Sequence, residues 1–195
     1  ATLVLGQFYG VPSNSAPLFL IAFAAGNLIG PLAIGHLFDT IGRKTMIAGT
    51  YITSGILLGI SAFLFNAGLL TALTQTIAWC VIFFFASSGA SAAYLTVSEI
   101  FPLEVRAKAI AVFFAIAQGF GALGPVIYGA LIGDGTEPFK LFLGYLLAAL
   151  MMIAGGLVAM VFGVAAERRS LEDIAAPLAA IKPGISPGRT SPQAI

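Results

Sequence analysis

The first charges in the chain occur at the end of the segment Gly30-Pro-Leu-Ala-Ile-Gly-His-Leu-Phe-Asp39-Thr-Ile-Gly42-Arg43-Lys44. Residues 1–38 carry no Asp, Glu, Lys or Arg, and neither do residues 45–98 on the other side of this cluster. Charged side chains are costly in hydrocarbon, so a lipid bilayer demands long uncharged apolar spans. The segment therefore predicts a polar turn between two membrane-spanning helices.

The overall composition also indicates an integral membrane protein. Of the 195 residues, 59% are hydrophobic and 9% are charged, whereas about 25% of the residues in a soluble domain are charged. The net charge of +1, without a basic stripe, gives no sign of a nucleic-acid partner. The single cysteine, Cys80, and the single histidine, His36, exclude a disulfide framework and a Cys/His metal cluster. We therefore predict no metal site and no cofactor.

The uncharged segments predict an all-α fold, a polytopic membrane helix bundle. A helix needs about 20 mostly apolar residues to cross a bilayer, and turn-forming residues separate the segments at 10–17, 66–68 and 133–138. The predicted full spans are residues 18–38, 45–65, 69–98, 109–132 and 139–165. Residues 1–9 are too short to cross and look like the end of a further helix. Because the chain begins with Ala1 inside an apolar run, we interpret this end as a cut through a longer protein.

The basic residues predict the orientation of the bundle. If the spans alternate, Lys140 lies on one side and the other basic residues share the opposite side: Arg43, Lys44, Arg106, Lys108, Arg168, Arg169, Lys182 and Arg189. Loops rich in Lys and Arg stay in the cytoplasm. We therefore expect a multi-pass protein of the inner or plasma membrane with its C-terminus in the cytoplasm. Residues 1–166 form the predicted transmembrane half-bundle. Residues 167–195 are predicted to be a cytoplasmic tail, with a short helix followed by a disordered segment.

Small residues recur inside several spans at spacings that favour close helix contact. In lipid, such residues let helix backbones approach each other, and a proline removes a backbone hydrogen bond and kinks its helix. These positions are interpreted either as static packing sites or as hinges of a moving helix: Gly26, Gly30, Gly55, Gly59, Gly124 and Pro125.

Three motifs resemble the major facilitator superfamily. Gly35 to Lys44 resembles its G-x-x-x-D-x-x-G-R-[RK] loop, and Glu99-Ile-Phe-Pro102-Leu-Glu-Val-Arg106 resembles the E-x-x-P-x-x-x-R element of its sugar-porter branch. Glu167-Arg-Arg-Ser-Leu-Glu-Asp-Ile resembles the exit from the last helix of that branch. The order and spacing of the motifs imply the C-terminal half of a transporter, from a partial helix 7 to helix 12.

The resemblance implies a cytoplasmic gate made of Asp39, Gly42, Arg43, Lys44, Glu99, Arg106 and Glu167. It also implies a substrate site near the midplane on helices 7, 10 and 11. Polar and aromatic side chains deep in the spans are costly unless they are paired or face water. Those chosen as cavity candidates are Gln7, Trp79, Gln118, Tyr94 and Gln75, whereas Asn27, beside Gly26, is expected to pack.

The resemblance implies a fragment of a secondary transporter that moves a sugar or a small organic acid or metabolite by alternating access. Proton coupling is expected, and its carboxylate would lie in a missing N-terminal half, since no full span here contains one. The expected partners are the lipid bilayer, the small-molecule substrate and that other half. The alternative is a non-transporting orphan half or membrane assembly subunit. An enzyme is disfavoured because the sequence shows no Ser-His-Asp set.

Overall fold

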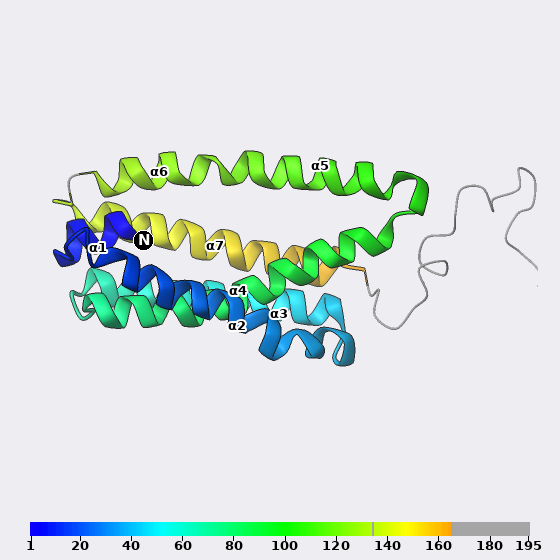
Figure 1. Cartoon of the computed structure of the whole chain (residues 1–195), viewed down its shortest axis with the longest axis horizontal. Coiled ribbons are helices and arrows are strands. Elements are labelled where there is room, and N and C mark those ends of the chain that lie inside the picture. The colour runs from blue at the N-terminus through cyan, green and yellow to red at the C-terminus, as the bar shows by residue number, and fades with distance from the viewer. Residues whose placement is uncertain (134, 165–195) are drawn as a thin grey trace, which may run out of the picture.

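The computed structural model describes residues 1–133 and 135–164. The tail predicted at residues 167–195 and the gate residue Glu167 lie outside the described residues, so the predicted division into domains stays a prediction. The described part is all helical, with helices α1 Thr2–Tyr9, α2 Ala16–Thr40, α3 Arg43–Asn66, α4 Ala72–Ile100, α5 Leu103–Gly121, α6 Leu123–Ile132 and α7 Pro138–Phe162 (Figure 1).

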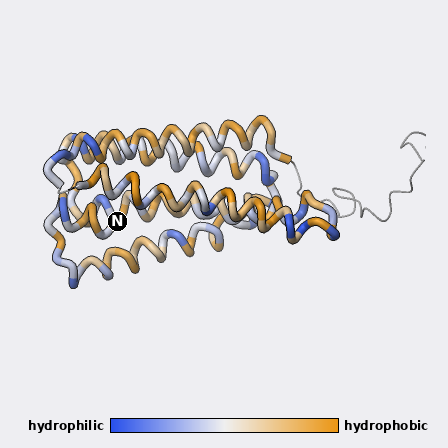
Figure 2. The backbone as a smooth tube through the Cα atoms, turned by 90° about the horizontal axis from the view of Figure 1, so that it is seen from above, coloured by the Kyte–Doolittle hydropathy of each residue, from blue (hydrophilic) through white to orange (hydrophobic). Residues whose placement is uncertain are grey.

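Within the described residues, five segments are long and apolar enough to span a membrane: α2, α3, α4, the pair α5 and α6 taken together, and α7. Figure 2 shows hydrophilic residues gathered towards the ends of the long helices, with hydrophobic residues along most of their length. Large apolar side chains are widely exposed, such as Leu32 at 75% and Phe162 at 78%. A surface of this kind suits lipid and not water. The predicted polytopic membrane helix bundle is therefore confirmed.

Two closely packed helix pairs form the body of the bundle. In the pair α3 and α7, a Cβ added at Gly55 would come within 2.8 Å of the Ala149 carbonyl oxygen, and one added at Gly156 within 2.9 Å of the Ala48 carbonyl oxygen. In the pair α2 and α4, a Cβ at Gly26 would lie 2.8 Å from the Cys80 carbonyl oxygen. Glycine is needed at these positions because the neighbouring backbone occupies the space of a side chain.

Hydroxyl groups help to join the two pairs through α3 and α4. The Ser54 hydroxyl is fully buried and lies 2.7 Å from the Thr50 carbonyl oxygen and 3.2 Å from the Ile82 carbonyl oxygen of α4. The Gly89 backbone of α4 passes so close to Thr50 that an added Cβ would lie 2.5 Å from its hydroxyl oxygen. The pairs α2/α4 and α3/α7 are thereby held as one packed body.

The fourth span is interrupted and packs less closely than the others. It begins at Leu103, earlier than the predicted residue 109, because Pro102 caps α5 and ends the preceding helix. Helix α5 stops at Gly121, four residues before Pro125, which lacks an N–H, and α6 begins at Leu123. No described residue of α5 is buried. Helix α4 contacts α5 through Tyr94, whose ring stacks on Phe114 with centroids 4.3 Å apart.

Candidate functional site

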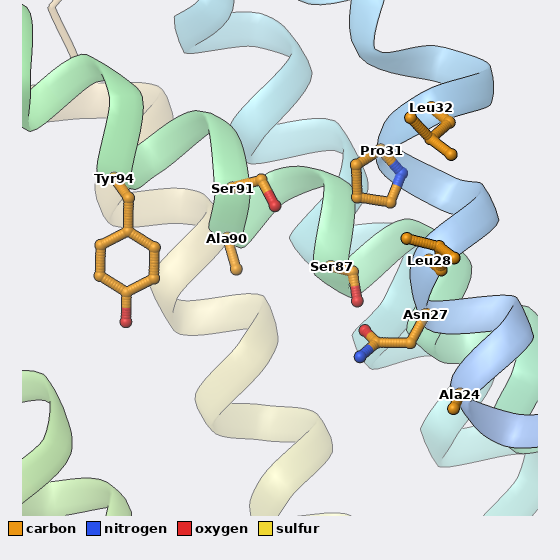
Figure 3. Close-up of a pocket in the computed structure, with 9 residues that line it drawn as sticks. All are labelled: Ala24, Asn27, Leu28, Pro31, Leu32, Ser87, Ala90, Ser91 and Tyr94. Carbon is orange, nitrogen blue, oxygen red and sulfur yellow. The ribbon is translucent and has the colours of Figure 1, made fainter. Parts of the chain in front are cut away.

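A polar groove lies between α2 and α4. It has a volume of about 510 Å³, and its polar lining residues are Asn27 of α2 and Ser87, Ser91 and Tyr94 of α4. Figure 3 shows Asn27 across from Ser87, with Ser91 and Tyr94 following along α4. The groove is the strongest candidate in the described residues for a site that binds a polar small molecule.

The groove exists because the glycines of α2 and its polar residue point in different directions. Gly26 and Gly30, four residues apart, share the face that touches the backbone of α4. Asn27 follows Gly26 and is rotated by about 100° around the helix, so its side chain leaves the contact face and is exposed. The packing role expected for Asn27 is therefore not what the structure shows.

The polar side chains of the groove differ from the buried hydroxyls of the same bundle. Ser88 and Thr96 of α4 each donate to a backbone carbonyl one turn earlier, at 2.8 Å. In the described residues, the side chains of Asn27, Ser87, Ser91 and Tyr94 make no such hydrogen bond to the protein. They are available to bind a ligand, whereas the hydroxyls of Ser88 and Thr96 are already paired.

Pro31 adds a backbone acceptor to the same groove. It lies inside α2 and lines the groove. Proline has no N–H, so it cannot donate the helical hydrogen bond to the carbonyl of Asn27, four residues earlier. A carbonyl freed in this way within a membrane span needs another donor, from a neighbouring helix, water or a bound molecule.

An ionic cluster lies where α2, α3 and α4 meet at one end of the bundle. The Arg43 Nη2 atom is 3.2 Å from the Asp39 Oδ1 atom, and its Nη1 atom pairs with the Glu99 Oε2 atom. The side chains of Arg43 and Glu99 are only 10% and 18% exposed, whereas that of Asp39 is 64% exposed. The pair between α3 and α4 is therefore the more sheltered of the two, and is screened less by water.

Gly42 makes the turn that brings these residues together. Its φ of 119° and ψ of 136° are accessible to glycine and strained for other residues. The turn places Arg43 as the first residue of α3 beside Asp39 near the end of α2. Figure 1 shows this turn at the same end of the bundle as the α4–α5 turn and the end of α7.

Two further predicted gate residues, Lys44 and Arg106, bond to backbone atoms at this end. The Lys44 Nζ atom donates to the Val161 carbonyl of α7 at 3.2 Å. The Arg106 Nε atom donates to the Phe101 carbonyl at 3.3 Å. A cavity of about 140 Å³ shares Pro31 and Ser91 with the groove and reaches Asp39 and Arg43. The groove and the ionic cluster are thus joined along α2 and α4.

The structure distributes the five predicted cavity residues among different environments. Tyr94 lines the groove. Gln75 is fully buried, accepting a hydrogen bond from the Tyr9 hydroxyl at 3.1 Å and donating to the Ser61 hydroxyl at 3.2 Å. Trp79 is 7% exposed, in a buried cluster near α1. Gln7 lines a separate cavity beside the α1–α2 loop, and Gln118 is exposed on α5.

The predicted small-residue positions also differ in their surroundings. Gly26, Gly30 and Gly55 meet a neighbouring backbone directly, whereas a Cβ at Gly59 would touch only the Ala149 Cβ at 3.9 Å. Gly124 has open space around it and precedes Pro125 in α6. The candidate set omitted three groove residues, Asn27, Ser87 and Ser91. The sequence signals that could have found them are the four-residue spacing of the two serines, which puts them on one helix face, and the proline four residues after Asn27.

The fold, the groove and the ionic cluster define a polytopic helical membrane protein. Residues 1–192 match the Major Facilitator Superfamily, and the chain belongs to this family of transporters. It is 31% identical over 140 residues to the fosmidomycin resistance protein of Escherichia coli (strain K12). That alignment covers 70% of this chain and 32% of the relative, so the chain spans about a third of its length. No solved structure matches the chain significantly.

Proposed function

We propose that the chain is the C-terminal half of a secondary transporter that moves a small polar organic molecule by alternating access. The observation that carries this proposal is the groove of Asn27, Ser87, Ser91 and Tyr94, whose side chains have no hydrogen-bond partner among the described residues. Unpaired polar groups within membrane spans mark substrate pathways. The other half of the transporter supplies the opposite wall of the groove.

The ionic cluster acts as the gate of this transporter. The pairs of Arg43 with Asp39 and Glu99 join the ends of α2, α3 and α4, next to the cavity that continues from the groove. Holding these ends together favours one of the two access states, and parting them favours the other. By the positive-inside rule this end faces the cytoplasm, in the inner or plasma membrane, and the C-terminus lies on the same side.

The substrate class that fits the groove is a sugar or another small hydroxylated metabolite. The polar groups that line the groove are an amide, two serine hydroxyls and a phenol, none of which is charged. Such groups both donate and accept hydrogen bonds, as the hydroxyl groups of a sugar do. Coupling to protons uses a carboxylate of the other half, because Asp39 and Glu99 lie at the ends of their helices.

Transport measurements with the whole transporter that contains this chain test the proposal. Uptake of radiolabelled glucose and lactate into proteoliposomes is measured with and without a pH gradient. Ser91→Ala should raise KM for the transported compound several-fold. Ser88→Ala is the control and should leave KM unchanged, because the Ser88 hydroxyl already donates to the Phe84 carbonyl. Equal effects of the two substitutions, or no transport of any hydroxylated compound, would contradict the proposed site.

A second candidate function is the export of an antibacterial compound. It is favoured by the similarity to a protein named for fosmidomycin resistance. Expression of the whole transporter in a fosmidomycin-sensitive strain should then raise the inhibitory concentration, and Ser91→Ala should lower it again. Resistance without uptake of sugar or lactate would favour this function over the first.

A further inference from the structure

An aromatic pocket lies at the end of the bundle opposite the ionic cluster. It has a volume of about 200 Å³ and its walls include Phe23 of α2, Trp79 and Phe83 of α4, Tyr128 of α6 and Tyr145 of α7. Residues that line it come from α1 as well. None of its lining residues is acidic or basic in its side chain, and none of them lines the groove.

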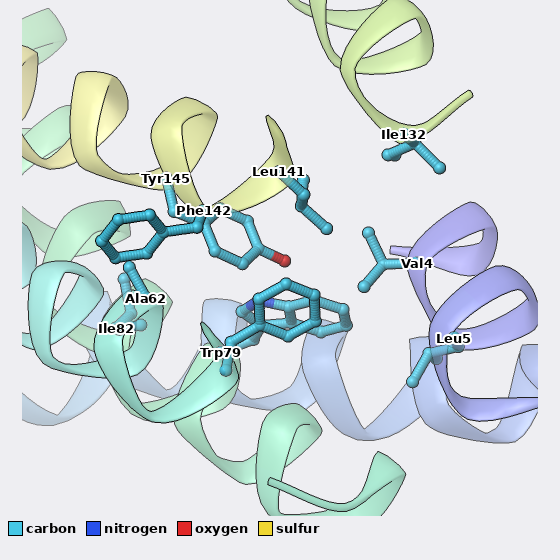
Figure 4. Close-up of a cluster of buried hydrophobic side chains, with 10 residues drawn as sticks. Val4, Leu5, Ala62, Trp79, Ile82, Ile132, Leu141, Phe142 and Tyr145 are labelled. Carbon is cyan, nitrogen blue, oxygen red and sulfur yellow. The ribbon is translucent and has the colours of Figure 1, made fainter. Parts of the chain in front are cut away.

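One polar group in this pocket has a proton without an acceptor. Tyr145 is 7% exposed and its hydroxyl is buried. The hydroxyl oxygen faces the indole N–H of Trp79, which can donate to it, but the hydroxyl proton has no acceptor among the described residues. Figure 4 shows this hydroxyl pointing towards the ring of Trp79. The indole of tryptophan has a donor and no acceptor, so Trp79 cannot accept the Tyr145 proton. A buried donor without an acceptor is unfavourable, and a bound acceptor would remove that cost.

The neighbouring tyrosine shows how this requirement is normally met. The Tyr128 hydroxyl lines the same pocket and donates to the Gly144 carbonyl at 2.8 Å. Its hydrogen bond is made within the protein, between α6 and α7. Of the two tyrosine hydroxyls at the pocket, only that of Tyr145 is left to donate to a guest.

We propose that this pocket binds a small neutral aromatic molecule that carries a carbonyl oxygen. Its ring packs among Phe23, Trp79 and Phe83, because aromatic rings attract one another in edge-to-face and offset geometries. Its carbonyl accepts the hydrogen bond from Tyr145. An apolar cavity of about 150 Å³ is known to hold one benzene ring, so the pocket admits a ring with a short substituent.

The site is separate from the groove of the proposed function. Phe23 and Phe83 precede groove residues of the same helices, Ala24 and Ser87, by one and four residues, but neither phenylalanine lines the groove. A guest among the aromatic side chains would contact α1, α6 and α7, which contribute nothing to the groove. Binding there is measurable on the chain itself and does not depend on which molecule the transporter moves.

Trp79 provides the assay, because it is the only tryptophan of the 195 residues. The chain is reconstituted in lipid nanodiscs and its Trp79 emission is titrated with acetophenone. Ethylbenzene, which has a similar shape and no acceptor, and tetramethylammonium, which tests the pocket as a cage for cations, are the comparison probes. Empty nanodiscs with free tryptophan correct for partition into lipid and for collisional quenching.

Acetophenone should change the emission saturably and bind more tightly than ethylbenzene. Tyr145→Phe, which keeps the ring and removes the donor, should weaken acetophenone binding about five- to tenfold, the equivalent of one hydrogen bond of about 1 kcal/mol, and leave ethylbenzene binding unchanged. Tyr128→Phe is the matched control and should stay within about twofold of the wild-type chain for acetophenone.

Thermal unfolding checks that both variants fold. Three outcomes would overturn the proposal: no saturable response to acetophenone, as expected if only water occupies the pocket; equal losses in Tyr145→Phe and Tyr128→Phe; or preferential binding of tetramethylammonium.

Discussion

Gly30 of α2 lies directly against the backbone carbonyl of Phe84 on α4, and no side chain fits between them. This contact brings two spans close enough to form the groove beside it. Gly30→Ala should therefore push α2 away from α4 and lower the free energy of unfolding by about 1–3 kcal/mol, the usual cost of overpacking. The measurement is thermal unfolding in detergent, followed by circular dichroism.

Gly35→Ala is the control for this prediction, because Gly35 lies in the same helix with open space around it. It should be neutral or slightly stabilising, since alanine favours a helix more than glycine does. If both variants lower the free energy of unfolding by the same amount, the close contact between Gly30 and Phe84 does not explain the loss.

The two carboxylates that pair with Arg43 should contribute unequally. Glu99→Gln should destabilise the chain more than Asp39→Asn, because the Glu99 side chain is 18% exposed and that of Asp39 is 64% exposed. Exposed ion pairs are worth about 0–1 kcal/mol, whereas breaking a sheltered pair removes an attraction that water screens less. Unfolding in 0.15 M and 1 M NaCl should show weaker salt dependence for the Glu99 contribution. An equal loss in both variants would contradict the ranking.

The same pair also allows a test of the gate in transport. Arg43→Glu and Glu99→Arg should each reduce uptake by the whole transporter, because each places like charges together at the ends of α3 and α4. The double exchange should restore part of the uptake, since it re-forms an opposite pair. A double variant as impaired as the singles would show that the ion pair is not the gate.

Gln75 should behave as a structural residue. Gln75→Leu removes the hydrogen bonds to Tyr9 and Ser61 and leaves both hydroxyls without this partner, so we expect a loss of about 1–3 kcal/mol and faster hydrogen exchange in α1. Gln118→Leu is the matched control, because the Gln118 side chain is exposed and makes no hydrogen bond to the described residues. It should change stability little; a loss as large as that of Gln75→Leu would refute this assignment.

Pro31 and Pro125 should differ in their effects on thermal stability and on substrate binding. Pro31→Ala supplies a missing hydrogen bond inside α2, so this variant should be more stable to heat. Pro125 lies in the first turn of α6, where an N–H has no acceptor within the helix, so Pro125→Ala should change the stability less. Only Pro31→Ala provides an N–H that can donate to the Asn27 carbonyl beside the groove. The carbonyl is then no longer available to a bound molecule, so this variant alone should raise KM of the whole transporter. A rise in KM with Pro125→Ala would argue against a role of this carbonyl.

The spans could be predicted from the sequence because the bilayer imposes a simple rule. Uncharged segments of sufficient length located α2, α3, α4 and α7, and Gly124-Pro125 marked the region where the fourth span is interrupted. The start of α5 was placed too late, because Glu104, Arg106 and Lys108 lie inside that helix and not in a loop. Charged residues mark a membrane boundary and need not mark the end of a helix.

The environment of each polar residue was harder to predict, since it depends on the rotation of the helices about their axes. Gln75 and Ser91 are both polar residues of α4, yet one is fully buried and the other is exposed in the groove. Their surroundings follow from which face of α4 meets α2 and α3. That choice is made by contacts between distant residues, such as Gly30 with Phe84, which the local sequence does not reveal.

The link between α2 and α3 consists of only Ile41 and Gly42. So short a link spans about 7 Å at full extension, which is far less than the thickness of the hydrocarbon layer. The C-terminal end of α2 and the N-terminal end of α3 must therefore lie at the same face of the bilayer. A substitution that draws one of these helix ends deeper into the hydrocarbon layer will shift the other end in the same direction.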